Sequence, residues 1–327
     1  MNLLEQQTAN RRRTWLVMLV FIAFLVLLGT GFDRFYLGLP ITAFPVGALF
    51  ALALGSGSAA FSYFGGDQVV LLSTHAVSLE QAQSAAQTDT DRLKLQQLGN
   101  VVDEMAIAAG LPRPKVYVVP DPDPNAFATG RDPAHASLAV TRGLLDKLDR
   151  EELQGVVAHE MSHVRNYDIR LMMIIAALVG AVILLSDFAS RWLWWGGGRR
   201  RDRDDGGNGA MAAILFAVWL IGIILAPIIG QLLAMMVSRQ REYLADASGA
   251  ELTRNPMALA RALQDIDNAP EPTKSIGRGT AHLCIADPLG RALGDKEHRA
   301  ADLFATHPPM AQRIARLKEM AFQSDHT

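Results

Sequence analysis

The chain has almost no cysteine and almost no net charge. Cys284 is the single cysteine among 327 residues. An intrachain disulfide, a multi-cysteine zinc site and a cysteine-held iron–sulfur cluster are therefore excluded, and a reducing compartment is favoured. The 31 basic and 33 acidic residues leave a net charge of −2. Because nothing in this balance predicts a nucleic-acid-binding surface, we expect no nucleic acid among the partners.

Hydrophobic residues make up 50% of the chain and gather in four blocks, at 14–32, 36–66, 171–186 and 206–238. A helix needs roughly 20 apolar residues to cross the hydrocarbon core of a bilayer. The first, second and fourth blocks are therefore strong candidates for spanning helices, and the third is weaker. The first block follows three arginines, as a signal peptide would. It lacks a small-x-small cleavage site and a second apolar block follows, so we favour a retained anchor.

These blocks divide the chain into four predicted parts. Residues 1–66 are expected to form a membrane region with two transmembrane helices, and residues 67–170 the first part of a catalytic domain. Residues 171–238 would form a second pair of transmembrane helices, joined by a flexible loop at 196–209. Residues 239–327 would complete the catalytic domain, with a mobile loop at 269–300. Whether that loop acts as a lid stays open.

Local patterns place a small β-sheet and several helices in the polar parts. Short β-type runs at 115–120, 125–130 and 137–141 predict the sheet. A helix beginning after Asp149 is predicted because Glu152, three residues later, completes a capping box. Further helices are predicted at 95–109, 238–252, 257–269 and 306–320, whereas residues 74–90 show no clear period.

The predicted helix after Asp149 carries the pattern His-Glu-x-x-His at 159–163. Residues four apart on a helix share a face, so the imidazoles of His159 and His163 can grip one Zn²⁺. Glu160 lies one step round the helix, where it can take a proton from a water molecule that the ion acidifies. The alternative is that two histidines lie four residues apart by accident. This five-residue pattern seldom arises by chance, so zinc binding is the better hypothesis.

A catalytic zinc needs a third protein ligand, and the sequence leaves its identity open. The extended pattern HExxHxxGxxH is excluded, because Asn166 and Ile169 stand where its glycine and third histidine would be. In the run REYLAD, Glu242 and Asp246 share a helix face, so one could bind zinc while the other accepts the free N–H of a ligating imidazole. The alternative for this pair is a solvated acidic face beside neighbouring arginines.

Five stretches together resemble the HtpX-like family of membrane-bound zinc metallopeptidases, relatives of the CAAX prenyl endopeptidases. They are NAFATGR at 125–131, TRGLL to LDREEL at 141–153, HEMSHVRNYD at 159–168, REYLAD at 241–246 and THPPMAQRIARL at 306–317. The resemblance implies a mostly α-helical, multi-pass membrane protein with an α+β zincin-like catalytic domain. It covers nearly the whole chain, and the glycine- and arginine-rich loop at 196–209 belongs to no motif of the family.

By this resemblance one Zn²⁺ per chain is held by His159, His163 and Glu242, with Glu160 as the general base. Asp246 would orient a ligand, and His307 would steady the oxyanion or the substrate. Asn166 and Asp168 fill the family's Asn-x-Asp positions, as part of the active-site framework. The strand carrying Asn125, Ala126, Phe127 and Ala128 could bind substrate by pairing with its backbone, although an ordinary core strand is the alternative.

The membrane topology follows from the shared metal site. If His163 and Glu242 bind one ion, the third and fourth apolar blocks either span as a pair or do not span. Arginines at 11–13 favour a cytoplasmic N-terminus and thus a cytoplasm-facing active site in the inner membrane. The arginines of the 196–209 loop would then lie outside, against the same rule, and a shallow hairpin would remove this conflict. We favour four spans.

The sequence therefore predicts a zinc endopeptidase that acts on membrane proteins or unfolded polypeptides, as part of protein quality control. One alternative is an intramembrane-cleaving metalloprotease, which the charges around the histidine motif argue against. Another is a catalytically silent membrane scaffold, and a third is a transporter. The apolar blocks one, two and four carry no ionisable residue at mid-depth to mark a transport path.

Overall fold

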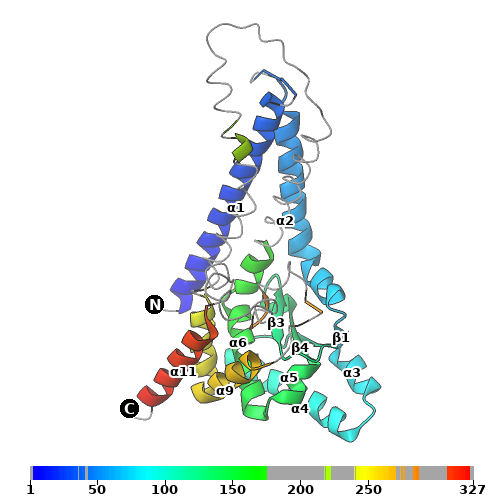
Figure 1. Cartoon of the computed structure of the whole chain (residues 1–327), viewed down its shortest axis with the longest axis vertical. Coiled ribbons are helices and arrows are strands. Elements are labelled where there is room, and N and C mark those ends of the chain that lie inside the picture. Colours follow the sequence, from blue (N-terminus) through cyan, green and yellow to red (C-terminus); the bar gives the residue numbers. More distant parts are fainter. Residues whose placement is uncertain are drawn as a thin grey trace. The chain divides into compact units, whose positions relative to one another are not determined.

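The computed structural model describes residues 3–35, 37–40, 43–174, 217, 219–221, 239, 241–269, 273, 275–276, 283–286 and 308–324 (Figure 1). Most of the third and fourth apolar blocks, the loop at 196–209, most of 269–300 and His307 lie outside these residues. The chain divides into two compact units. One comprises Arg12–Ser62 and Ile174–Leu233, and the other comprises Met1–Arg11, Tyr63–Met173 and Ala234–Thr327.

The first unit contains parts of two long helices, α1 (Leu3–Phe35) and α2 (Val46–Ser73). Asp33 is buried and accepts hydrogen bonds from the backbone N–H groups of Gly47 (2.6 Å) and Ala48 (3.1 Å). These are N–H groups of the first turn of α2, which have no partner within their own helix. The aspartate therefore fixes the start of α2 beside the end of α1.

The requirements of a spanning helix were met in only one place along the described residues. No single described helix combines the length and apolarity needed to cross a membrane. The bent pair Val46–Ser58 and Ala60–Ser73, inclined at 44°, meets both requirements together.

The second unit is built on a four-stranded mixed sheet, in the order β1-β2-β4-β3. Its strands are β1 (Val77–Ser78), β2 (Lys115–Val119), β3 (Ala126–Gly130) and β4 (Ala136–Thr141). The strands β2 and β4 run parallel, while β1 and β3 pair antiparallel with their neighbours. The prediction of a small sheet in a mostly helical chain is confirmed, and β3 lies at one edge of it.

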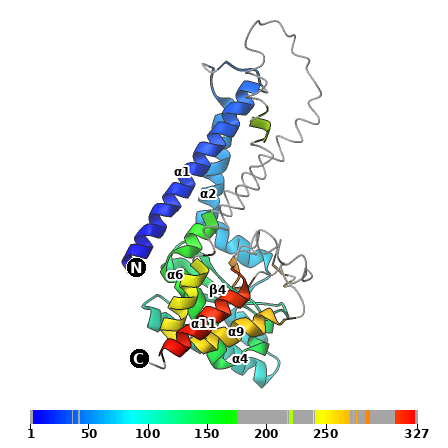
Figure 2. The ribbon, with the colours of Figure 1, turned by 60° about the vertical axis from the view of Figure 1, so that its left-hand side comes forward.

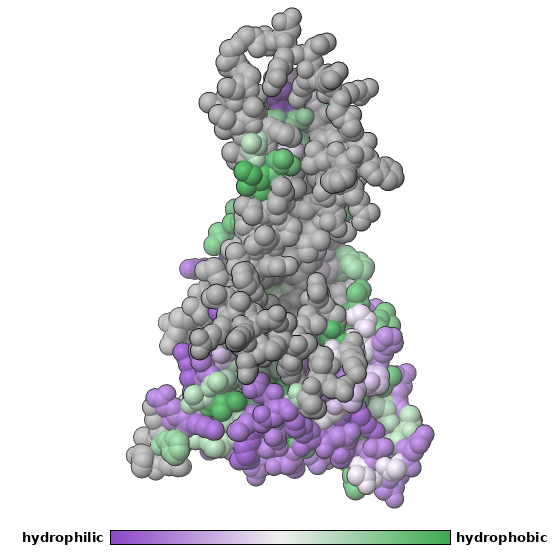
Figure 3. All heavy atoms as spheres, viewed as in Figure 1, coloured by the Kyte–Doolittle hydropathy of each residue, from purple (hydrophilic) through white to green (hydrophobic). Residues whose placement is uncertain are grey.

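Helices cover one face of this sheet and form the main core. They are α4 (Asp89–Ala109), α5 (Arg142–Lys147), α6 (Arg150–Arg165), α9 (Pro256–Asp267) and α11 (Met310–Ser324). Alternate strand residues such as Val116, Leu138 and Ala126 face these helices, and Phe127 and Ala139 face the opposite side. Figure 2 shows α11 lying beside α9 in this unit. Hydrophilic side chains gather over the end of the unit that α4 and α5 form (Figure 3).

The region 74–90, which showed no clear period, contains the short strand β1 and the helix α3 (Leu79–Ala85). Ser78 and Gln81 form a capping box at the start of α3. A helix this short shows too few turns for an apolar period to be visible, so its caps are its main sequence signal. The helix α2 extends past the expected boundary at residue 66, with the 44° bend between Ser58 and Ala60, and ends at Ser73.

Candidate metal centre

The two histidines of the His-Glu-x-x-His pattern lie on α6, as predicted. Asp149 accepts a hydrogen bond from the backbone N–H of Glu152 (2.9 Å), and the Glu152 side chain accepts one from the backbone N–H of Asp149 (3.0 Å). This capping box fixes the start of α6 and thereby the face that each later residue presents. The Nε2 atoms of His159 and His163 lie 3.2 Å apart.

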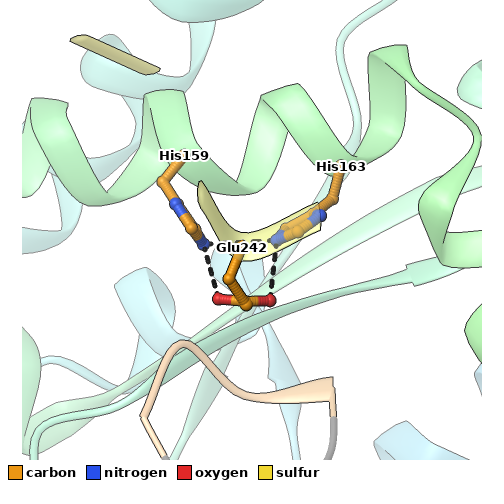
Figure 4. Close-up of side chains that lie close together, drawn as sticks. All are labelled: His159, His163 and Glu242. Carbon is orange, nitrogen blue, oxygen red and sulfur yellow. Dashed lines mark hydrogen bonds and ion pairs between the residues drawn. The ribbon is translucent and has the colours of Figure 1, made fainter. Parts of the chain in front are cut away.

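Glu242 lies opposite these imidazoles, on a helix that covers the described residues 241–253. Its Oε2 is 3.6 Å from His159 Nε2 and its Oε1 is 3.4 Å from His163 Nε2. One ligand atom from each residue fits within 4.8 Å of the other two. Figure 4 shows the carboxylate pointing at both ring nitrogens. The three side chains therefore converge from two helices on one point.

This helix is buried, so the alternative of a solvated acidic face is wrong. Glu242 and Asp246 are each only 3% exposed. Gly249, one turn further on, allows the helix to approach α6. A Cβ at Gly249 would lie 3.0 Å from the backbone nitrogen of His159 and 3.2 Å from its Cα. The distance between Glu242 and the histidines thus depends on the absence of a side chain at this position.

The Nδ1 atom of each imidazole lies close to a carboxylate. His159 Nδ1 lies 3.0 Å from Asp246 Oδ1, and His163 Nδ1 lies 3.1 Å from Asp168 Oδ2. A proton on Nδ1 is thereby favoured, which leaves Nε2 as the free ligand atom facing Glu242. Asp246 thus faces His159 and Asp168 faces His163, from outside the point where the three ligand atoms meet.

The surrounding carboxylates also change the affinity of the imidazoles for protons. Burial alone would lower the pKa of His159, but Asp246 and Glu242 outweigh burial and raise it. Burial would likewise lower the pKa of His163, and the carboxylates of Asp168 and Glu242 raise it well above its ordinary value. A group of buried anions that attracts protons in this way also attracts a divalent cation, and the two compete for the same nitrogens.

Two buried arginines complete this arrangement, and sequence reasoning missed both. Arg241 Nη1 lies 3.2 Å from Asp168 Oδ1, and Arg313 makes a two-pronged contact with Asp246 (2.7 and 2.8 Å). Burial would raise the pKa of Asp246, but the Arg313 guanidinium lowers it below its ordinary value. Arg241 and Arg313 stand inside the quoted motifs, yet only the three-dimensional arrangement shows that they back the aspartates.

Glu160 lies on α6 between the two histidines and is 1% exposed. Among the residues that the structure describes, neither of its carboxylate oxygens has a hydrogen-bond partner of normal geometry. Burial raises the pKa of this carboxyl above its ordinary value, although the neighbouring imidazoles and the backbone of Ala128 oppose the rise. A buried carboxyl whose pKa is shifted in this way, beside two imidazoles, is typical of a functional site.

The edge strand β3 lies next to this carboxylate, and the chain itself covers part of the edge. Asn125 accepts a hydrogen bond from the backbone N–H of Thr141 on β4 (2.9 Å), so Ala126 and Ala128 direct their backbone groups to the open edge. The carbonyl of Ala126 accepts a hydrogen bond from the backbone N–H of Ile285 (2.9 Å). Phe127 forms an isolated bridge with Cys284, and the Asn125 side chain donates to Ala286 O (3.2 Å).

The remaining predicted residues fall at the ends of elements. Asn166 is fully buried and forms the C-cap of α6, where its backbone N–H donates to Ser162 O (3.0 Å). His307 lies outside the described residues, just before Pro308 and Pro309, which precede α11. The structure therefore brings His159, His163, Glu242, Asp246 and Asp168 together, and leaves the place of His307 as a prediction.

The donor set fits a zinc ion. Two imidazole nitrogens and one carboxylate are a known ligand set of catalytic zinc, which keeps a fourth position for water or substrate. The carboxylates behind the imidazoles and the adjacent Glu160 are the usual surroundings of such an ion. The site therefore defines the class of HExxH zinc metallopeptidases.

Comparison with known proteins narrows this class. The model of Peptidase family M48 matches residues 92–321. A "Protease HtpX homolog" from Caldanaerobacter subterraneus subsp. tengcongensis is 43% identical over 97% of this chain and 98% of that protein. Another from Streptococcus gordonii is 41% identical over 97% of this chain and 100% of its own length. The crystal structure of S. mikatae Ste24p covers 93% of this chain and 66% of that chain, with 17% identity and a TM-score of 0.48.

The chain belongs to peptidase family M48, among the HtpX-type proteases. It is a zinc metalloendopeptidase, and its substrates are polypeptides.

Proposed function

We propose that this chain is a membrane-embedded endopeptidase that cleaves membrane proteins or misfolded polypeptides at a cytoplasm-facing active site, in protein quality control. The convergence of His159, His163 and Glu242 beside the buried Glu160 carries the proposal. In it, the first three residues hold one zinc ion per chain and Glu160 is the general base. When bound, zinc supplies a Lewis acid that polarises the scissile carbonyl and acidifies a water molecule.

The position of Glu160 supports both halves of a proton shuttle. Its carboxylate accepts a proton from the attacking water, whose oxygen bonds to the scissile carbonyl carbon. The carboxylic acid then returns this proton to the amide nitrogen as the C–N bond breaks. A carboxyl whose pKa burial has raised holds such a proton more readily than an exposed one does. Asp246 and Asp168 keep the imidazoles oriented throughout, Asn166 belongs to the framework, and His307 stays a candidate for steadying the oxyanion.

We propose that the substrate backbone pairs with the edge of β3. The position of Asn125–Ala128 at one edge of the sheet supports this role. Its first part, at Ala126 and Phe127, already contacts the chain's own residues 284 and 285. Ala128 is the next residue whose backbone groups point to the edge, so it is the residue we expect to bind substrate. Main-chain pairing of this kind tolerates many sequences, which suits a protease that acts on varied unfolded segments.

The membrane part of the proposal rests on the four apolar blocks and on the bent pair in α2. Residues 1–66 and 171–238 would anchor the chain in the inner membrane, and residues 67–170 and 239–327 would form the catalytic domain in the cytoplasm. An impermeant maleimide tests the orientation with Asp103→Cys in a Cys284→Ser background, since Asp103 is exposed on α4. Labelling of intact spheroplasts from outside would contradict it.

The catalytic assignment is tested by Glu160→Gln, with Glu151→Gln as the matched control. Both residues lie on α6, but Glu151 is exposed at its start. Zinc content is measured after purification in detergent, together with cleavage of an unfolded test protein. We expect about one zinc per chain in all three proteins, and cleavage by the parent and Glu151→Gln alone. Equal cleavage by Glu160→Gln would refute the assigned base, and a parent that binds zinc but never cleaves would favour a silent scaffold.

A further inference from the structure

The guanidinium of Arg313 is fully buried at the metal centre, although the residue comes from α11 near the end of the chain. Its Nε and Nη2 donate to the two oxygens of Asp246 at 2.8 and 2.7 Å. Its Nη1 donates to Ile285 O at 2.7 Å and lies 3.2 Å from Glu242 Oε2. A buried charge is tolerated only when it is paired and hydrogen-bonded, and Arg313 meets this condition through parts of the metal centre.

The two-pronged contact determines how Asp246 faces the histidine. Asp246 Oδ1 is shared by Arg313 Nη2 (2.7 Å) and His159 Nδ1 (3.0 Å). Two parallel hydrogen bonds from a planar guanidinium fix the plane of a carboxylate, which a lysine ammonium cannot do. The orientation of His159, and hence the direction of its Nε2, therefore depends on a residue that does not bind the ion.

Arg313 also acts directly on the third ligand. The Glu242 carboxylate lies among several other buried anions. The guanidinium of Arg313, at 3.2 Å from Glu242 Oε2, attracts this carboxylate and restrains its position. One guanidinium thus restrains a ligand and, through Asp246, the orientation of a second ligand.

On the basis of the proposed zinc site, we propose that Arg313 is a positioning residue that sets the affinity and geometry of the metal centre from the C-terminal helix. It acts through Asp246 and Glu242, and its Nη2 lies 3.5 Å from His159 Nε2. The same guanidinium holds Ile285, next to the edge of β3. The helix α11 therefore contributes a side chain on which the geometry of the metal centre depends.

A purely structural role, in which Arg313 only docks α11, makes a different prediction. The helix has other attachments: Leu317 is fully buried, Arg316 lies 3.7 Å above the Tyr243 ring, and Tyr243 donates to Gln312 (2.9 Å). Arg316 is exposed and lies one turn from Arg313 on the same helix. Arg316→Lys is therefore a matched control that perturbs docking without touching the metal centre.

The experiment uses the full chain in detergent and compares the parent with Arg313→Lys, Arg316→Lys, Asp246→Asn and the double variant Arg313→Lys/Asp246→Asn. Zinc affinity is measured by competition with a chelator, and coordination geometry by the visible absorption of bound Co²⁺. We expect Arg313→Lys to weaken zinc binding by about 10- to 100-fold and to change the Co²⁺ spectrum. Arg316→Lys should stay within about twofold of the parent, and the double variant should lose less than the sum of the single losses.

Three outcomes would overturn the proposal. The first is a folded Arg313→Lys protein with the affinity and Co²⁺ spectrum of the parent, and the second is an equal loss in Arg316→Lys. If Arg313→Lys does not fold, the Asp246→Asn variant decides, because it removes the carboxylate charge and keeps the arginine. The third outcome is a zinc affinity of Asp246→Asn equal to that of the parent. A parent that binds neither zinc nor cobalt would instead refute the proposed function, so the two failures are distinguishable.

Discussion

Replacing Gly249 by alanine tests how closely the ligand helix must approach α6. The new Cβ would lie 3.0 Å from His159 N, 3.2 Å from His159 Cα and 3.4 Å from the carbonyl carbon of Ala158. Ordinary carbon contacts begin at about 3.5 Å, so the two helices must separate by a few tenths of an ångström. All three neighbours are backbone atoms, which cannot rotate away as a side chain can.

This shift should weaken metal binding more than it destabilises the fold. Overpacking a core by a methyl group costs about 1–3 kcal/mol, and alanine in place of a helical glycine returns about 1 kcal/mol. The net loss of stability is therefore at most about 2 kcal/mol. Zinc sites tolerate errors of only about 0.2 Å in ligand distance, and Gly249 lies on the same helix as Glu242. We expect the zinc affinity of Gly249→Ala to fall by about tenfold or more.

The matched control is Gly155→Ala, also at a contact between helices. A Cβ there would meet the backbone nitrogen of Leu259 at 2.9 Å, so α6 must separate from α9, which carries no ligand, and not from the helix of Glu242. Both variants are compared by thermal unfolding and by chelator competition for zinc. Gly155→Ala should lose stability with little loss of zinc affinity. If Gly249→Ala binds zinc as the parent does, or if both variants lose affinity equally, the spacing argument is wrong.

Two further predictions concern the start of α2 and the pH dependence of zinc binding. Asp33→Ala should lower the melting temperature, because two N–H groups of α2 lose their acceptor at a cost of about 0.5–2 kcal/mol. Asp33→Asn keeps one acceptor and should lose less; equal losses would contradict the capping role. Zinc affinity should fall as the pH is lowered, and should begin to fall above the pH expected from an ordinary histidine. The pKa of His163 is raised, so its imidazole stays protonated, and unable to bind zinc, up to a higher pH. A chelator titration at several pH values checks this, and an affinity that is constant down to mildly acidic pH would contradict it.

The parts of the fold that local signals determine could be predicted from the sequence. The capping box at Asp149 and Glu152 placed the start of α6. The helix predicted at 95–109 ends before Gly110, whose φ of 65° is a left-handed conformation that glycine adopts without strain. The strands at 115–119 and 126–130 followed from their β-type composition. Each of these elements is specified by residues close together in the chain, so pattern and caps are sufficient.

The candidate site was predictable only in part, because it depends on contacts between distant segments. Four-residue spacing placed His159 and His163 on one face. Spacing left Glu242 and Asp246 as alternatives for the third ligand, and the family resemblance decided between them. No periodicity could show that Arg313 would be buried against Asp246, since an arginine on an amphipathic helix is usually exposed. The hydrogen bond between Ile285 and Ala126 joins segments even further apart in the chain. Neither segment has a sequence pattern that predicts this contact.

The order of the metal-centre residues along the chain has a consequence for biosynthesis. Once α6 has been synthesised, a nascent chain contains both histidines and Glu160, whereas Glu242 and Asp246 follow only after a long apolar stretch and Arg313 follows them. Contacts between such distant segments form late, because the intervening chain must first be ordered. A nascent chain at this stage therefore contains the proposed general base without the complete set of metal ligands. We expect peptide-bond cleavage to begin only after the helix that carries Glu242 has been made and has packed against α6.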